Sequence, residues 1–176
     1  MKTATQQITI TGLFIALCVI VPFVFHLAGL GMIFLPMFLP ILLAGFIIRF
    51  PLAMLVGILG PIVSSVLTGM PPLFPTAVSM MVEGMAAAGL ASFLFQARKM
   101  PLWLVLPLAV VAERIVRVAM IFSILPLFGL PAREWSIAEI TLTLPGVALQ
   151  LFLVPMVLFM LWRANVIKRK LWWKIS

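Results

Sequence analysis

The feature that most constrains this chain is its series of long apolar runs, in which charged residues are nearly absent. Hydrophobic residues make up 65% of the 176 residues and charged residues only 9%, whereas soluble domains are about 45–50% apolar and 25% charged. A helix that crosses a membrane needs about 20 predominantly apolar residues. The sequence therefore predicts an all-α integral membrane protein.

Proline, glycine and charged residues divide the chain into six apolar runs. Six spans of about 20 residues use roughly 120 residues, which leaves no room for an extramembrane domain. We expect a single transmembrane domain over residues 1–176. Its six predicted spans lie at about 8–30, 34–48, 52–68, 76–95, 102–128 and 140–161, followed by a basic tail at 163–176.

Basic residues gather at the chain start, at the turns after the second and fourth runs, and at the end. The three other loops together contain one, Arg133. Cytoplasmic loops carry an excess of Lys and Arg, so both termini are predicted to be cytoplasmic, which requires an even number of spans. The tail beside the last span suits anionic lipid better than nucleic acid. The residues of the basic sides are Lys2, Arg49, Arg98, Lys99, Arg163, Lys168, Arg169, Lys170 and Lys174.

The composition also excludes several kinds of chemistry. The chain has one His, one Cys, no Asp and four Glu, which excludes most metal sites, a disulfide framework and catalysis by a cluster of carboxylates. An intramembrane enzyme is disfavoured, because there is also no Gly-x-Ser-x-Gly motif. We expect no metal, no cofactor and no enzymatic activity.

Some charged residues nevertheless lie within the apolar runs. Glu83 is in the fourth run, and Arg114 and Arg117 lie near the middle of the fifth with Glu113 beside them. An Arg at a helix centre costs about 2.5–3.5 kcal/mol on insertion scales, so two are not expected to face lipid. Arg114 and Arg117 are three residues apart and are predicted to share a face. Glu83, about 10 Å from the outer end of its run, is placed to meet Arg117.

Two interpretations of these charges stay open. In the first, a buried ion pair fixes helix packing. In the second, the charges line a polar pocket that opens outward. Two Arg facing one Glu would leave surplus positive charge and favour a ligand with a carboxylate or phosphate. Glu113 would weaken that preference if it neutralised Arg117 at i, i+4 spacing.

Weaker candidates surround this group. Ser79 and Thr76 share the Glu83 face by helical spacing and would add hydroxyl groups, and Met80 would supply a flexible apolar wall. His26 ends the first run at its outer edge. Ordinary explanations compete with these roles, because Met commonly faces lipid and a lone His commonly makes an interfacial hydrogen bond.

Gly12 and Ala16 form a small-xxx-small pair in the first run. Such pairs let helix backbones approach each other closely. Their meaning depends on whether a partner helix exists.

Three stretches of the sequence have a characteristic pattern of proline, glycine and small residues. They are 35–46 with Pro36 and Pro40, 57–72 with Gly57, Gly60, Pro61, Pro71 and Pro72, and 80–89 with Glu83 before a run of small residues. Together they resemble one family, the substrate-binding S components of energy-coupling factor (ECF) transporters. The likeness extends from about residue 8 to 161 and is nearest to the pantothenate-type and unassigned subgroup.

The resemblance implies a prokaryotic, multi-pass cell-membrane protein with an S-component-like bundle that captures a vitamin-type micronutrient outside the cell. It implies a pocket in the outer half, mainly between the fourth to sixth helices. It also implies docking through Gly12 and Ala16 onto a transmembrane coupling subunit that carries two ATP-binding-cassette ATPases. The chain itself has no P-loop motif. We expect a small-molecule substrate, for example an anionic one such as pantothenate. The alternative is a proton-coupled secondary transporter with Glu83 as the titrating group.

Overall fold

The computed structural model describes residues 4–124 and 141–165, and the regular structure within those ranges is helical. Beside the α-helices there are three π-helical turns, Leu73–Ala77 (η1), Phe93–Ala97 (η2) and Met120–Ile124 (η3). The α-helices are α1 (Ala4–Leu27), α2 (Gly31–Phe34), α3 (Phe38–Ile47), α4 (Phe50–Thr68), α5 (Val78–Ser92), α6 (Leu102–Ala119) and α8 (Leu144–Arg163).

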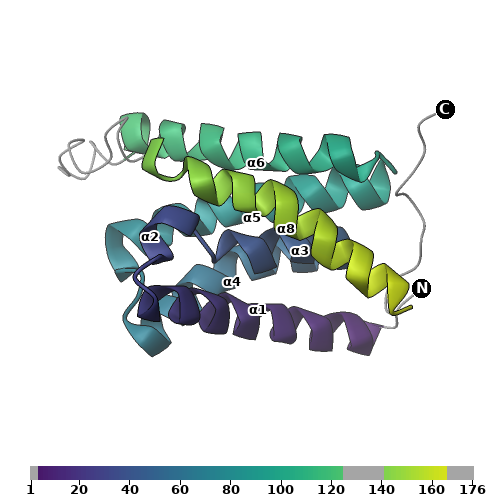
Figure 1. The fold of residues 1–176 in the computed structure, drawn as a ribbon, viewed down its shortest axis with the longest axis horizontal. Helices are drawn as coiled ribbons and strands as arrows, with labels where there is room; N and C mark the ends of the chain where they lie inside the picture. Colours follow the sequence, from purple (N-terminus) through teal and green to yellow (C-terminus); the bar gives the residue numbers. More distant parts are fainter. Residues whose placement is uncertain (1–3, 125–140, 166–176) are drawn as a thin grey trace.

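The long helices run back and forth along one direction, and α3 lies inside the bundle (Figure 1). The Ala4 end of α1 and the Arg163 end of α8 lie at the same end of the bundle, which we call the terminal end. The short helix α2 and the start of α8 lie at the opposite end, called here the far end. This arrangement fits the predicted even number of crossings.

In the described part of the chain, four helices are long and apolar enough to cross a membrane: Ala4–Leu27, Phe50–Thr68, Leu73–Ala97 and Leu144–Arg163. The fifth predicted run forms α6, which has 18 residues but contains three charged side chains. Residues 125–128, at the end of that run, and residue 140, at the start of the next, lie outside the described residues. So do Lys2, Arg133 and the tail from residue 166 onward.

The second predicted run, 34–48, is not one continuous helix. Its regular part, α3, has 10 residues and so spans only about 15 Å, half of a hydrocarbon core of about 30 Å. The break has a local cause, because a proline disfavours the helical conformation of the residue that precedes it. Leu35, which precedes Pro36, has a left-handed φ of 45°. Pro40 is tolerated because it lies in the first turn of α3.

Small residues bring α5 into backbone contact with two neighbours. A Cβ atom at Gly57 of α4 would lie 2.4 Å from the carbonyl of Gly84, and one at Gly45 of α3 would lie 2.9 Å from the carbonyl oxygen of Ala88. Neither position can carry a side chain unless the backbones separate. Helices in membranes associate through such small-residue contacts, and this contact fixes the position of Glu83, the residue before Gly84.

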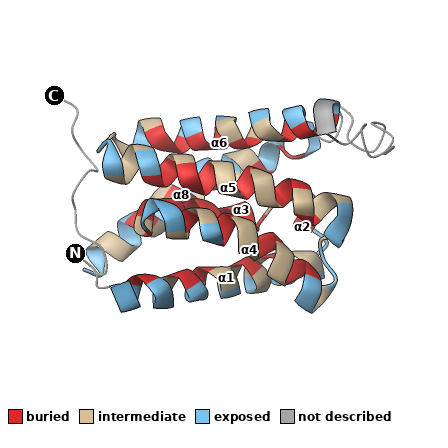
Figure 2. Cartoon of the chain, turned by 180° about the vertical axis from the view of Figure 1, so that it is seen from behind, coloured by how far each residue is buried: buried red, intermediate tan, exposed pale blue. Residues whose placement is uncertain are grey.

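The apolar core has two clusters, and α3 contributes to both. One lies between α3, α5, α6 and α8 and includes Leu42, Ala91, Val105 and Leu158. The other lies between α1, α3, α4 and α5 and includes Phe14, Cys18, Ile41, Val56 and Met80. Figure 2 shows the resulting pattern, in which α3 is mostly buried while α1 has an exposed outer face. That exposed face is apolar, as expected for helices that contact lipid.

Candidate functional site

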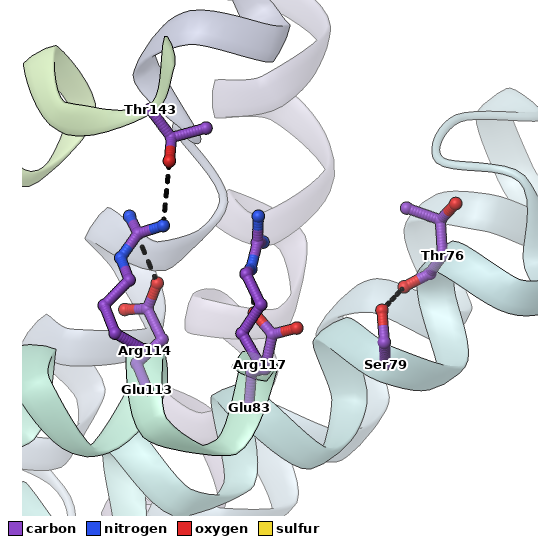
Figure 3. Close-up of polar contacts among 7 residues, drawn as sticks. All are labelled: Thr76, Ser79, Glu83, Glu113, Arg114, Arg117 and Thr143. Carbon is purple, nitrogen blue, oxygen red and sulfur yellow. Dashed lines mark hydrogen bonds and ion pairs between the residues drawn. The ribbon is translucent and has the colours of Figure 1, made fainter. Parts of the chain in front are cut away.

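An ion pair between Arg117 and Glu83 lies inside the bundle. The Nε of Arg117 donates a hydrogen bond of 3.0 Å to Oε2 of Glu83, and the side chains are 4% and 0% exposed. The contact expected from the positions of these residues in the fourth and fifth runs is therefore present. It joins α5 to α6 (Figure 3), and the two residues lie in the first half of α5 and the last turn of α6, the parts of these helices nearer the far end.

A second polar contact joins α6 to the residue that precedes α8. Nη1 of Arg114 donates a hydrogen bond of 2.9 Å to Oγ1 of the buried Thr143. The Glu113 carboxylate lies beside the same guanidinium, with 3.7 Å between Oε1 and Nη2, too long for a hydrogen bond. Figure 3 shows Arg114 extending from α6 toward Thr143. The part of α8 nearest the far end is thus held to α6 by a polar side chain.

The register of α6 explains why the three charged residues differ in burial. The inward face of the helix includes Leu106, Ala109 and Val110 and continues into Glu113 and Arg117. Because Glu113 and Arg117 are four residues apart, they share this buried face.

Arg114 is one position further around the helix and is 18% exposed. We expected the two Arg to share a face. In the structure Arg117 shares its buried face with Glu113, and its ion-pair partner is Glu83.

The formal charges of this polar group balance. Glu83 faces Arg117 and Glu113 lies next to Arg114, so two carboxylates meet two guanidinium groups. The expected surplus of positive charge assumed one Glu opposite two Arg. Any preference for an anionic ligand therefore depends on which hydrogen-bonding atoms are left without a partner rather than on net charge.

Several buried polar atoms of this region have no hydrogen-bond partner among the described residues. They are both carboxylate oxygens of Glu113, Nε and Nη2 of Arg114, and both amide atoms of Gln150. Buried polar groups are nearly always hydrogen-bonded, and an unsatisfied one costs about 1–3 kcal/mol. These atoms present both donors and acceptors to whatever occupies the space beside them.

Gln150 is a candidate that the sequence analysis missed. It is fully buried on the inward face of α8, which also includes Gly146, Val154 and Leu158. Val154 and Leu158 pack in the same apolar cluster as Ala109 and Val110 of α6. Gln150 lies one turn before Val154, and Glu113 one turn after Ala109, so both extend that cluster toward the far end. The available signal was an amide in the middle of an otherwise apolar run.

The remaining predicted site residues of η1 and α5 lie near Glu83 in sequence but make other contacts. The hydroxyl of the buried Ser79 donates to the backbone carbonyl of Thr76 at 2.9 Å, and the pair lies to one side of the ion pairs in Figure 3. Met80 packs in the apolar cluster with Phe14 and Cys18. The structure brings together Glu83, Arg114 and Arg117, but not these three.

His26 lines a separate cavity between α1 and α4. The cavity has a volume of about 180 Å³ and is lined mainly by apolar side chains, with Ser64 and Thr68. The imidazole ring also fills the space beside Gly31, where an added Cβ would lie 2.4 Å from it. The His26 side chain therefore packs against the start of α2.

The predicted docking pair lies on the exposed face of α1. Gly12 and Ala16 are exposed, together with Leu13 and Ile20. An added Cβ at Gly12 would meet no atom within 4 Å, so packing within this chain does not require glycine there. A partner helix would find close access to the backbone at this point.

No family model, curated protein or solved structure matches this chain. Its class therefore rests on the helices themselves, whose lengths and apolar composition fit a multi-pass helical membrane protein. Within the described residues, no group of three or more His, Cys, Asp or Glu side chains is arranged to hold a metal ion.

Proposed function

We propose that this chain is the substrate-binding subunit of an ECF-type importer in a prokaryotic cell membrane. In this proposal it captures a vitamin-type micronutrient from the outside with high affinity. It delivers the micronutrient together with a separate transmembrane coupling subunit and two ATP-binding-cassette ATPases. The terminal end of the bundle is the cytoplasmic side, and the far end is the outer side.

The observation that carries the proposal is the set of unsatisfied buried atoms on Glu113, Arg114 and Gln150. A purely structural ion pair is retained when its lone pairs and N–H groups are satisfied. Arg117 and Glu83 are joined by a direct hydrogen bond, whereas both carboxylate oxygens of Glu113 and two guanidinium nitrogens of Arg114 have no hydrogen-bond partner among the described residues. Ionisable groups inside a membrane protein are functional candidates by default.

The identity of these atoms limits the ligand. Nε and Nη2 of Arg114 need an acceptor, for which a carboxylate or phosphate oxygen is the strongest partner. The Glu113 carboxylate accepts hydrogen bonds only and needs a hydroxyl or N–H group, and the Gln150 amide needs both a donor and an acceptor. A small molecule with an anionic end and a hydroxyl or amide group, such as pantothenate, meets these requirements.

The first test is to identify the bound molecule. The protein is purified in mild detergent, denatured, and the released small molecules are analysed by mass spectrometry. A stoichiometric micronutrient is expected from the native protein and not from Arg114→Gln. The matched control is Arg98→Gln, at the opposite end of α6, which should retain the molecule.

The second test concerns the partner. Gly12→Leu and Ala16→Leu should leave ligand binding unchanged and reduce co-purification with ATPase subunits, because neither side chain enters the interior of this chain. A protein that carries no ligand, and that alone moves a solute along a proton gradient in proteoliposomes, would overturn the proposal. That result would favour the proton-coupled transporter with Glu83 as the titrating group.

A further inference from the structure

A second concave surface lies between α4 and α5, at the terminal end of the bundle and away from the polar group. It is an open apolar groove of about 360 Å³, and its walls include Phe50, Met54, Met85, Gly89 and Phe93. Along α5 the groove extends from Met85 to Phe93, about 12 Å at 1.5 Å per residue. Gly89 leaves the groove open, because it has no side chain.

Basic residues flank one end of this groove. Arg49 directly precedes Phe50, and Arg98 and Lys99 follow the π-helical turn that begins at Phe93. All three are exposed. Among the described residues, neither ion pair involves any of them. The groove is thus apolar along its length and positively charged at the terminal end.

Hydrogen bonds hold the two basic turns close to each other. The Ser92 hydroxyl donates to the carbonyl of Ile48 at 2.9 Å, and the Gln96 amide donates to the carbonyl of Gly45 at 3.1 Å. The backbone N–H of Arg49 in turn donates to Oε1 of Gln7 at 3.3 Å. These contacts tie the α3–α4 turn to the end of α5. The backbone that carries Arg49 is therefore held close to the backbone that leads into Arg98 and Lys99.

Aromatic contacts complete the charged end. The rings of Phe50 and Phe93 meet with 6.1 Å between their centroids, and the guanidinium of Arg98 lies 5.4 Å over the Phe93 ring. A guanidinium that lies over a ring can still bind a phosphate by two hydrogen bonds. Arg98 therefore lies over one ring of this aromatic pair, and Arg49 directly precedes the residue that carries the other ring.

We propose that this groove binds an anionic phospholipid. One acyl chain lies along Met54, Met85 and Gly89, and the phosphate headgroup is held by Arg98 and Arg49 with Lys99 beside them. Basic pockets beside transmembrane helices bind anionic headgroups in this way. The inference requires only that the protein lies in a membrane, and it is independent of the ligand proposed for the polar group.

The test compares two lipids that differ only in their headgroup. Delipidated protein in detergent is mixed with phosphatidylglycerol or with phosphatidylcholine of identical acyl chains, and bound lipid is counted by native mass spectrometry. Phosphatidylglycerol should be retained preferentially. Each Lys or Arg near a headgroup contributes enough to change binding about fivefold, so Arg98→Gln should reduce retention of phosphatidylglycerol by about that factor.

The chain provides a matched control for this variant. Arg163, at the end of α8, also lies over an aromatic ring, 5.9 Å from the centroid of Phe159, but it is not at the groove. Arg163→Gln should change retention less than twofold. Ala86→Phe, which places a ring in the groove, should reduce lipid retention while Arg98 remains.

Three results would overturn the inference. The first is equal retention of the two lipids by the native protein, which would leave an apolar surface that suits any acyl chain or a partner helix. The second is an equal effect of Arg98→Gln and Arg163→Gln, which would indicate nonspecific attraction. The third is unchanged retention in Ala86→Phe. Thermal unfolding of each variant establishes that it is folded.

Discussion

The helices α5, α6 and α8 run through both halves of the bundle, but their buried side chains differ between the two halves. Toward the terminal end, α5, α6 and α8 pack through aliphatic and small side chains such as Ala91, Val105 and Leu158. Toward the far end, the same helices bury the polar side chains of Glu83, Arg117 and Gln150. The apolar half needs only shape and hydrophobicity. The polar half needs specific partners, because each buried charge is unfavourable without one.

An apolar far half built like the terminal half would avoid every buried charge. The far half instead buries two ion pairs, and the atoms of Glu113, Arg114 and Gln150 that have no hydrogen-bond partner among the described residues are the basis of the ligand proposed above. The difference between the halves can be tested with four sets of variants, given in order of decreasing expected effect on stability or ligand affinity.

The largest effect is expected for Glu83→Leu. Removing one partner of a buried ion pair leaves an uncompensated charge and costs about 3–5 kcal/mol, so the variant should unfold at a much lower temperature. The double variant Glu83→Leu with Arg117→Leu should recover most of this loss, because no buried charge remains. Thermal unfolding in detergent measures both. Equal destabilisation by the single and double variants would show that the pair is not coupled as described.

In the apolar half, Leu158→Ala should lower stability by about 2 kcal/mol, the low end of the range for Leu→Ala in a core. The side chain is 1% exposed, so its removal leaves a cavity. Ligand retention by the folded protein should not change, since Leu158 belongs to the other half. A loss of ligand without a loss of stability would contradict the separation of the two halves.

The third prediction separates a ligand site from a structural one. Gln150→Leu removes a buried amide whose atoms lack hydrogen-bond partners, so the stability of the ligand-free protein should stay equal or rise by about 1 kcal/mol. Ligand affinity should nevertheless fall about tenfold, the equivalent of one lost hydrogen bond of about 1.4 kcal/mol. Binding calorimetry beside thermal unfolding tests both effects. A stabilised variant with unchanged affinity would remove Gln150 from the site.

The smallest effect is expected on the outer face of α1. Ile20 is 57% exposed, and an apolar side chain facing lipid gains little on burial because lipid is also apolar. Ile20→Ala should change stability by less than about 0.5 kcal/mol. A large loss measured by thermal unfolding would indicate that this face is covered within the folded protein.

The sequence was sufficient to predict the helical class and the meeting of Glu83 with Arg117, for identifiable reasons. A long apolar run permits few structures in lipid, since every backbone group must be satisfied internally. Opposite charges at similar depths in neighbouring runs have few other partners. The break at Leu35 was predictable in principle from Pro36, but apolar residues on both sides concealed it within one run.

The direction of each side chain within the bundle was not predictable from spacing alone. Arg114 and Arg117 are three residues apart, and the rotation of α6 decides which of them enters the core. That rotation is set by contacts distant in sequence, such as the contact between Arg114 and Thr143. The burial of Gln150 was not predictable for the same reason, because the apolar run that contains it does not indicate which face of the helix is buried.

The close contact between α8 and α2 has a consequence for how water and lipid are kept out of the interior. A Cβ atom at Gly146 would lie 2.7 Å from the carbonyl oxygen of Phe34, so the backbone of α8 covers the end of α2. The chain between α2 and α3 is not helical, and irregular backbone at membrane depth is stable only where protein covers it or where it borders a cavity. Gly146 therefore allows α8 to lie directly on the backbone of α2, and a bulkier residue there would separate the two helices and uncover the irregular backbone.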